Sequence, residues 1–269
     1  MINILFGGNH KVYDGILLCL MSMTKHCKDV LSIYILTADI TELNPDFKPI
    51  EEEQRKFLED YIKKTNQKSK VTLITLDKTF NEWIMSSENK LNTYTPFAFL
   101  RLFADKVKDL PNKIIYMDTD IMCNGNIKEL FDIDIENYEL GVVKDRLGKV
   151  FIKHNYFNSG VLLMNLDKIR ETNLFDRVKD LCLTKKMAFP DQSALNKLCK
   201  YKLYLPRKFN EQGNPRKDTV IQHFCKRLKS IIPLTTINIK QWEIEKVQKV
   251  YKIHNYDDIY EQYKSLNKN

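Results

Sequence analysis

The chain has 269 residues, of which 43% are hydrophobic, enough to bury a sizeable core in one large α/β domain or two smaller ones. This composition excludes a disordered chain. The 43 Lys and Arg residues against 35 Asp and Glu give a net charge of +8, which favours an anionic partner such as nucleic acid, an acidic membrane surface or a phosphate-bearing substrate.

The cysteines and the apolar runs indicate in which cellular compartment the protein is found. Six cysteines are scattered without a C-x-x-C pair, so the sequence predicts neither a zinc knuckle nor a disulfide framework, and a reducing cytoplasm fits best. The first apolar run, INILF, is too short for a signal peptide, and GILLCLMSM at 15–23 is shorter than a membrane span. We expect a cytoplasmic protein without a transmembrane helix.

The first part of the chain alternates between strand and helix patterns. Residues 2–6 form an apolar run that ends in a glycine turn, and apolar positions at helical spacing follow up to residue 28. The apolar run 30–36 predicts a second strand. A strand-helix-strand unit of this length is usually parallel and right-handed.

The alternation continues to residue 117. Residues 49–68 have an acidic start and a lysine-rich end, which suits a helix dipole, and 71–76 predicts a third strand. A helical stretch at 95–107 leads to the strand at 111–117. This order predicts an α/β fold with a mostly parallel sheet and helices on its faces.

The second half has a different pattern. The segments 138–143 and 157–166 read as strands without a long helix between them, which indicates a mixed sheet. Two short helices are expected near 166–183 and 191–200, and 220–224 (VIQHF) is expected as the last strand. From about residue 237 the chain is polar, lysine-rich and punctuated by aromatic residues, and we expect it to wrap the domain as one or two helices.

Two carboxylates follow the strand at 111–117 directly. In open parallel sheets, ligands collect at the carboxyl ends of the strands, where Asp118 and Asp120 lie. Two like charges this close are costly unless something positive sits between them. Oxygen ligands suit magnesium or manganese, which in turn bridge phosphate oxygens, whereas the plain alternative is a pair of solvated turn residues.

This D-x-D stands among other motifs in a fixed order. The segment YMDTDIM resembles the metal-binding D-x-D of glycosyltransferases with the GT-A fold. The whole order of motifs is similar to glycosyltransferase family 8, the retaining galactosyl- and glucosyltransferases, including lipopolysaccharide galactosyltransferases. The resemblance covers about residues 2–229, and its strongest parts are ILFGGN, FLRLF, YMDTDI, YFNSGVLLMNL, PDQSALN and IQHF.

The resemblance implies the GT-A fold, with a mostly parallel, Rossmann-like nucleotide-binding sheet, helices on both faces and a smaller mixed part on the acceptor side. Residues 1–236 would form this single domain, and 237–269 a basic, aromatic, helical tail. Gly7, Gly8 and Asn9 match the turn that holds uridine and ribose, where small residues let the backbone approach the base.

The resemblance also implies a site for the donor phosphates and sugar. The D-x-D itself, Asp118, Thr119 and Asp120, belongs to it. An arginine on an otherwise apolar helix needs an anionic partner or a route to water, and Arg101 in FLRLF matches a family arginine near the donor phosphates. The residues that match those lining the donor sugar are Asp145, Asn158, Ser159, Asp191 and Gln192.

Asp191 has a second interpretation, because it follows Pro190 and suits the N-cap of a helix. His223, at the end of VIQHF, matches the family's third protein ligand of the metal, beside Asp118 and Asp120. Because imidazole suits manganese better than magnesium, Mn²⁺ is expected, with Mg²⁺ as the alternative.

The chain departs from the family pattern after this histidine. The family has a glycine three residues on and then Lys-Pro-Trp, whereas this chain reads HFCKRLKSI. Lys226 replaces the glycine, and Lys229 keeps the spacing of the lysine that reaches the diphosphate. Lys240 and Trp242 in NIKQW come later in a similar order, which indicates a longer closing loop.

The reaction implied is transfer of galactose or glucose, with retention, from UDP-galactose or UDP-glucose to a glycan or glycolipid acceptor of the cell envelope. The metal and lysines would offset charge on the leaving UDP. Gln192 stands where a protein nucleophile would be sought, but an amide is a poor nucleophile. This favours an ion-pair route in which the departing phosphate takes the acceptor proton, while Asp191 and Asp145 orient the sugar hydroxyls.

Other functions stay open at this point. A sugar-nucleotide nucleotidyltransferase also uses a parallel sheet and a metal held by acids. The 13 tyrosines allow a self-glucosylating, glycogenin-like protein. A non-enzymatic basic module for membrane or nucleic acid fits the charge, although no nucleic-acid motif is present and no such partner is expected. An enzyme in peripheral contact with the anionic inner face of the plasma membrane also fits +8.

Overall fold

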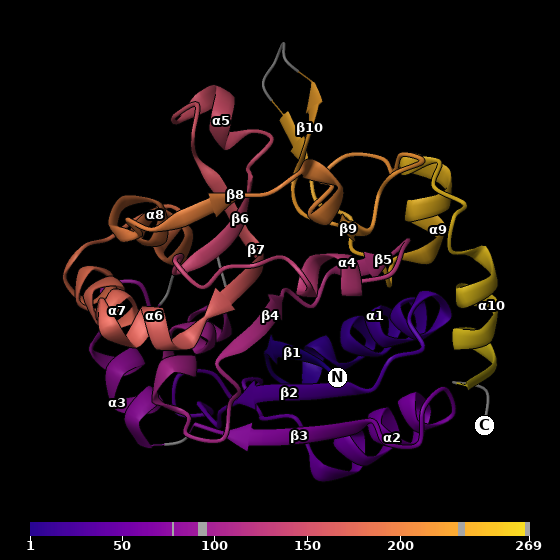
Figure 1. The fold of residues 1–269 in the computed structure, drawn as a ribbon, viewed down its shortest axis with the longest axis horizontal. Helices are drawn as coiled ribbons and strands as arrows, with labels where there is room; N and C mark the ends of the chain where they lie inside the picture. The colour runs from indigo at the N-terminus through magenta and orange to yellow at the C-terminus, as the bar shows by residue number, and fades with distance from the viewer. Residues whose placement is uncertain (77, 91–95, 231–234, 267–269) are drawn as a thin grey trace.

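The computed structural model describes residues 1–76, 78–90, 96–230 and 235–266, and its centre is a seven-stranded sheet in the order β3-β2-β1-β4-β7-β6-β8 (Figure 1). Strands β1 to β4 run parallel, β7 runs antiparallel to β4 and β6, and β8 runs parallel to β6. The strands of this sheet are β1 (Ile2–Gly7), β2 (Leu31–Thr37), β3 (Lys70–Thr75), β4 (Lys113–Met117), β6 (Leu140–Lys144), β7 (Phe157–Asn165) and β8 (Lys202–Tyr204). The α/β class and the mixed second half are therefore confirmed.

Helices cover both faces of this sheet. The α-helices before the C-terminal tail are α1 (Tyr13–His26), α2 (Glu52–Lys63), α3 (Lys78–Ser86), α4 (Lys128–Phe131), α5 (Gly148–Phe151), α6 (Leu166–Glu171), α7 (Leu174–Thr184) and α8 (Pro190–Leu198). The 3-10 helices in the described ranges are η1 (His10–Val12), η2 (Pro96–Lys106) and η3 (Arg207–Phe209). The predicted helix at 95–107 thus has 3-10 geometry, and Thr95 lies outside the described residues.

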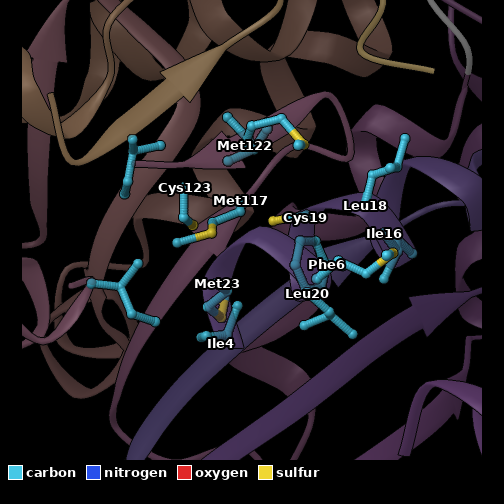
Figure 2. Packing of buried hydrophobic residues seen from close by; sticks show 14 of the residues in the cluster. Ile4, Phe6, Ile16, Leu18, Cys19, Leu20, Met23, Met117, Met122 and Cys123 are labelled. Atoms are coloured by element: carbon cyan, nitrogen blue, oxygen red, sulfur yellow. The ribbon is translucent and has the colours of Figure 1, made fainter. Parts of the chain in front are cut away.

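The core consists of two apolar clusters, one on each side of the sheet. Successive side chains of a strand point to opposite faces, so Ile4 and Phe6 of β1 join one cluster and Leu5 the other. Figure 2 shows the first cluster, where β1 and Met117 of β4 meet α1 through residues such as Leu20. The second cluster lies under η2, α3, α6, α7 and α8. These buried faces fix the register of the strands that carry the site.

Several local predictions were wrong. Strand β9 (Ile221–His223) is not the last one, because β10 (Arg227–Ser230) and β11 (Thr235–Ile237) form a two-stranded antiparallel sheet after it. These strands are short and largely polar, which gives no hydrophobic pattern to detect. The helix expected over 166–183 is broken, because Asn173 adopts the left-handed conformation (φ 52°). Asparagine tolerates this conformation better than most residues.

The C-terminal segment folds back over the first half of the chain. It contains α9 (Ile244–Lys246), a π-helix labelled η4 (Val247–Tyr251) and α10 (Asp257–Leu266), which lies beside α1 in Figure 1. The Lys25 ammonium of α1 is 2.6 Å from the Asp258 carboxylate. The predicted boundary at residue 236 falls within β11, and the division into domain and tail stays a prediction. Within the described residues, no helix combines the length and apolar composition that a membrane span needs.

Candidate metal centre and donor site

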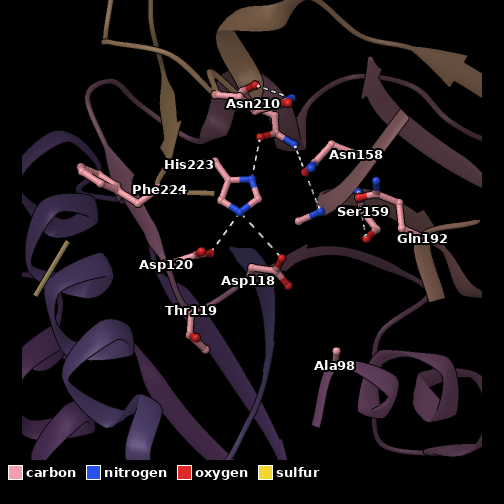
Figure 3. Close-up of polar contacts among 12 residues, drawn as sticks. Ala98, Asp118, Thr119, Asp120, Asn158, Ser159, Gln192, Asn210, His223 and Phe224 are labelled. Carbon is pink, nitrogen blue, oxygen red and sulfur yellow. Dashed lines mark hydrogen bonds and ion pairs between the residues drawn. The ribbon is translucent and has the colours of Figure 1, made fainter. Parts of the chain in front are cut away.

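Two strands far apart in the sequence bring three metal-ligand side chains together. Asp118 and Asp120 lie between β4 and β5 (Ile121–Cys123), and β5 pairs antiparallel with β9, which places Ile121 opposite His223. The His223 Nε2 atom is 3.0 Å from an Asp120 oxygen and 3.8 Å from an Asp118 oxygen (Figure 3). One ligand atom from each side chain lies within 4.8 Å of the others. Two carboxylates and an imidazole at this spacing suit a divalent cation such as Mn²⁺.

A hydrogen-bonded chain fixes the orientation of the His223 ring. Asp145 accepts a hydrogen bond from Asn158 Nδ2 at 2.9 Å, and Asn158 Oδ1 accepts one from Asn210 Nδ2 at 2.9 Å. The remaining Asn210 oxygen lies 3.1 Å from His223 Nδ1. A carboxylate only accepts hydrogen bonds, so the Asn158 and Asn210 amide groups each point their NH2 group towards Asp145 and their oxygen towards His223. The Asn210 oxygen therefore accepts from His223 Nδ1, which carries the proton.

The neutral imidazole would therefore turn the lone pair of Nε2 towards Asp118 and Asp120. A lone pair facing two carboxylates is repelled unless a proton or a cation lies between them. The arrangement of His223 thus fits a metal ligand whose outer partner is an amide.

The buried carboxylate of Asp120 is paired with a positive charge, the Lys240 ammonium. Burial by itself would raise the pKa of this carboxyl group, but the Lys240 ammonium beside it holds that pKa well below its usual range. Lys240 forms an ion pair with Asp120, so a positive charge already stands beside one ligand oxygen. Burial opposes the charge on Lys240, yet Asp120 raises the pKa of the ammonium above its usual value.

Asp118 is held from the opposite side by Arg101 and Tyr116. The Arg101 guanidinium donates to Asp118 at 2.8 Å and stacks on the Tyr116 ring at 4.1 Å, while the Tyr116 hydroxyl donates to the same carboxylate at 2.7 Å. Only 3% of Arg101 is exposed. Burial would lower the pKa of Arg101, but Asp118 and Asp191 outweigh this effect and raise it. Arg101 therefore has an anionic partner, Asp118, rather than a route to water, and its contact with the donor phosphates stays a prediction.

The next group of predicted residues lies where β7 meets α8. The Ser159 amide donates to Gln192 Oε1 at 3.0 Å, and the Ser159 hydroxyl lies 3.3 Å from Asp191. Arg101 Nε is 3.7 Å from Asp191, and burial raises the pKa of this carboxyl group although Arg101 opposes the shift. Phe189 is the N-cap of α8, so the N-cap interpretation of Asp191 was wrong.

The turn after β1 lies against the D-x-D. A Cβ added to Gly8 would be 2.3 Å from Val12 and 3.8 Å from Thr119, so a larger side chain has no space there. Gly7 lies against Leu100, and Asn9 is buried. The Gly7-Gly8-Asn9 turn is therefore at the same edge of the sheet as Asp118 and Asp120.

The lysine predicted for the diphosphate is not with the other residues. Lys229 is exposed on β10, whereas Lys240 contacts Asp120. The neighbours of Lys240 are fixed, because Gln241 Nε2 donates to the Thr119 carbonyl at 2.7 Å and Trp242 lies against Gly15. The β10–β11 ribbon precedes Lys240, which agrees with the longer closing loop predicted from NIKQW.

Three contributors to this geometry were missed by sequence reasoning. An added Cβ on Gly160 would be 2.2 Å from the His223 ring and 2.8 Å from Asp118, so only glycine fits between them. A glycine inside an apolar strand is a signal for such an approach. Tyr116 and Asn210 gave no comparable signal, because strand tyrosines and loop asparagines are common.

Comparisons with known proteins agree with this geometry. The family model described as Glycosyl transferase family 8 matches residues 3–232. A lipopolysaccharide 1,2-glucosyltransferase of Escherichia coli K12 is 31% identical over 126 residues, 42% of this chain and 37% of the relative. A lipopolysaccharide 1,3-galactosyltransferase of Salmonella typhimurium is 28% identical over 149 residues, 48% of this chain and 44% of the relative. The chain spans less than half the length of the curated relatives it matches.

Solved structures have the same fold. The galactosyltransferase LgtC, determined in complex with donor and acceptor sugar analogs, superposes with a TM-score of 0.71 at 16% identity, covering 98% of this chain and 96% of LgtC. The glycosyltransferase GlyE of Streptococcus pneumoniae TIGR4 gives 0.65 at 20% identity, covering 99% and 65%. The GT-A fold predicted from the motifs is therefore confirmed. With the match covering residues 3–232, the chain belongs to glycosyltransferase family 8.

Proposed function

We propose that this chain is a retaining, manganese-dependent hexosyltransferase that moves galactose or glucose from a UDP-sugar to a glycan or glycolipid acceptor of the cell envelope. The observation that carries the proposal is the convergence of Asp118, Asp120 and His223 at the carboxyl edge of the sheet, with ligand atoms within 4.8 Å of one another. Family membership favours glycosyl transfer over nucleotidyl transfer and over a binding module.

The three side chains would hold one divalent cation, which when bound offsets negative charge on the diphosphate as UDP leaves. Manganese is favoured over magnesium because one ligand is an imidazole. Lys240 adds a second positive charge on the same side, and we assign to it the diphosphate contact expected of Lys229. Gly7, Gly8 and Asn9 would accept the uridine.

The donor sugar would lie against β7 and α8. Arg101 is fixed by Asp118, by the Ser159 carbonyl at 2.5 Å and by the Tyr116 ring, so little conformational freedom is lost when substrate binds. Asp191 and Asp145 would orient sugar hydroxyls, as would Asn158 and Ser159.

Gln192 is the residue at the position expected for a protein nucleophile, but its side chain is poorly suited to that role. Its side-chain oxygen accepts a hydrogen bond from the Ser159 amide at 3.0 Å, and an amide oxygen is a weak nucleophile. This supports a route in which the bond from the sugar to UDP breaks first. The acceptor hydroxyl then attacks from the same face and gives its proton to the departing phosphate.

The acceptor would be presented at a membrane surface. Val150, Phe151 and Ile152 at the end of α5 are 69%, 60% and 55% exposed, and Lys149 and Lys153 flank them. An exposed apolar tip between basic residues suits peripheral contact with an anionic bilayer. The protein would then lie at the inner face of the plasma membrane, and binding to lipid vesicles tests this location.

The transferase proposal is tested by donor hydrolysis. We expect release of UDP from UDP-glucose or UDP-galactose to require Mn²⁺ and to fall at least 100-fold in Asp118→Ala. The reason is that removing one of three ligands leaves the remaining charges unmatched. The measurement is UDP release with each donor, with and without chelator. Equal rates for the variant and the parent, or no UDP from either donor, would contradict the proposal. Incorporation of label into the protein itself would indicate self-glucosylation.

A further inference from the structure

A second group of positive charges lies beside the metal centre. Two adjoining hollows of about 490 and 460 Å³ share the residues Arg146, Gln212 and Asn214, and we call the two hollows together the basic cleft. Its walls are the segment 144–149, the loop 207–216, part of β10 and the η4 region. Eight Lys and Arg residues line it, and among the described lining residues Glu211 is the one carboxylate. This imbalance points to an anionic ligand.

Arg227 is the most informative of these residues, because it is buried and lacks an anion. It is 8% exposed and donates to Asn214 Oδ1 at 2.7 Å and to the Gly213 carbonyl at 2.9 Å. Its Nε atom is buried and has no hydrogen-bond partner among the described residues. Within the described part of the chain, no carboxylate lies within ion-pair distance of Arg227. A buried guanidinium of this kind is costly unless something negative compensates it.

Arg146 lines both hollows, and its guanidinium lies against Gly213, whose carbonyl accepts from Arg227. A Cβ on Gly213 would be 2.6 Å from its guanidinium, so the glycine provides the room that Arg146 occupies. The backbone of Arg146 is fixed by Gln212, whose side-chain oxygen accepts from its amide at 2.7 Å. Among residues whose positions are described, Arg146 forms no ion pair either. Glu211, the one carboxylate among the described lining residues, is already engaged, because the Arg207 guanidinium lies 3.0 Å from it.

The cleft adjoins the metal centre rather than lying on a remote surface. Asn210 lines one hollow and also contacts His223 Nδ1 at 3.1 Å. Asp145 lies between Lys144 and Arg146 in the sequence and belongs to the same hydrogen-bonded chain through Asn158. Hollows of this size accept a ligand of several rings or groups. The cleft therefore lies next to His223, on the other side of Asn210.

We propose that the basic cleft binds a phosphate group carried by the acceptor, so that the acceptor of this enzyme is anionic. The proposal rests on the proposed transferase function, and it adds the chemical class of the acceptor. Arg146 and Arg227 would bind the phosphate oxygens, since a planar guanidinium matches a phosphate with two parallel hydrogen bonds. The exposed lysines Lys149 and Lys229 would add long-range attraction.

The test uses glucose 6-phosphate and glucose as a pair that differs in charge. Calorimetric titrations are carried out on protein saturated with UDP and Mn²⁺, so that the donor's own diphosphate site is filled. We expect glucose 6-phosphate to bind at least tenfold more tightly than glucose. The double variant Arg146→Gln/Lys149→Gln should lose at least tenfold in affinity for glucose 6-phosphate, because charge-assisted hydrogen bonds are lost.

The matched control carries the same charge change elsewhere. Lys56 and Lys68 are exposed, in α2 and in the loop after it, on the opposite side of the molecule from α5 and β10 (Figure 1). Lys56→Gln/Lys68→Gln should bind glucose 6-phosphate like the parent. Arg227→Gln should show the largest loss, and if it does not fold, the exposed double variant still decides the question.

The outcomes of these titrations separate the hypotheses. Equal binding of glucose and glucose 6-phosphate, or equal affinity in the cleft variant and the control, would overturn the proposal. Octyl phosphate is the second probe: tighter binding than glucose 6-phosphate places the phosphate at the lipid end of the acceptor, and weaker binding places it on the sugar. If UDP and Mn²⁺ themselves do not bind, the transferase function fails, whereas titration of the free protein still tests the cleft.

Discussion

Two buried arginines, one in the metal centre and one in the basic cleft, show how differently these adjacent regions are built. Arg101 and Arg227 are 3% and 8% exposed, and each stacks on a tyrosine, at 4.1 Å and 3.9 Å. Arg101 has a carboxylate at 2.8 Å, whereas the partners of Arg227 among the described residues are a side-chain amide and a backbone carbonyl. The buried arginine of the metal centre is thus neutralised by a carboxylate of the chain, whereas we propose that a ligand neutralises the buried arginine of the cleft.

The sharpest test of this comparison concerns two lysines assigned to different regions. Lys240 contacts Asp120 in the metal centre, and Lys229 lines the cleft. We expect Lys240→Met to lower kcat/KM for donor hydrolysis about 100-fold, because a preorganised positive charge at the leaving group is worth about 2.7–4 kcal/mol. Lys229→Met, the matched variant, should change this value less than threefold.

Initial rates of UDP release with UDP-glucose or UDP-galactose measure both variants. A large loss in Lys229→Met with little change in Lys240→Met would reverse the assignment. It would also return the diphosphate contact to the lysine that the sequence spacing suggested.

A smaller effect is expected from the outer end of the hydrogen-bonded chain. In Asp145→Asn the new amide can donate to Asn158, which opposes the present order and favours a proton on Nε2 of His223. We expect Mn²⁺ affinity to fall about tenfold, since outer partners of metal ligands typically contribute 10–100-fold. Titration of Mn²⁺ measures the affinity, and ¹⁵N chemical shifts of the histidine ring report the tautomer.

Unchanged Mn²⁺ affinity together with an unchanged tautomer would show that Asp145 does not act through His223. Its interaction with the donor sugar would then be its main role. Stability serves as the control, because Asp145 Oδ1 also accepts from the Leu147 and Gly148 amides and asparagine retains an oxygen for them.

Elements held by interactions between residues close in the sequence were predicted well, and those that depend on distant residues were not. The elements from β1 to β4 were predictable because each buries a regular apolar face and each connection is local. The D-x-D and His223 were found through motifs, although their meeting depends on the pairing of β5 with β9 across about 100 residues. Neither three-residue strand has a periodicity of its own.

What could not be predicted depends on tertiary contacts. The family motif places a lysine for the diphosphate at a fixed spacing after the histidine, and this spacing identified Lys229. In the folded chain the β10–β11 ribbon follows His223, and the lysine beside Asp120 is Lys240. Gly160 matters only because His223 packs against it. The lack of an anion at Arg227 is likewise invisible in the sequence, since partners are known only when the chain is folded.

The smallest effect concerns the apolar tip next to the cleft, and it sharpens the idea that this end of the molecule faces the acceptor. We expect Val150→Ser/Phe151→Ser/Ile152→Ser to weaken binding to vesicles containing anionic lipid about fivefold, because exposed apolar area no longer enters the interface. Met85→Ser on α3, also exposed, is the control and should bind like the parent. Co-sedimentation with vesicles measures both. If the tip variant binds as well as the parent while added salt releases both, attachment is purely electrostatic and the tip has no membrane role.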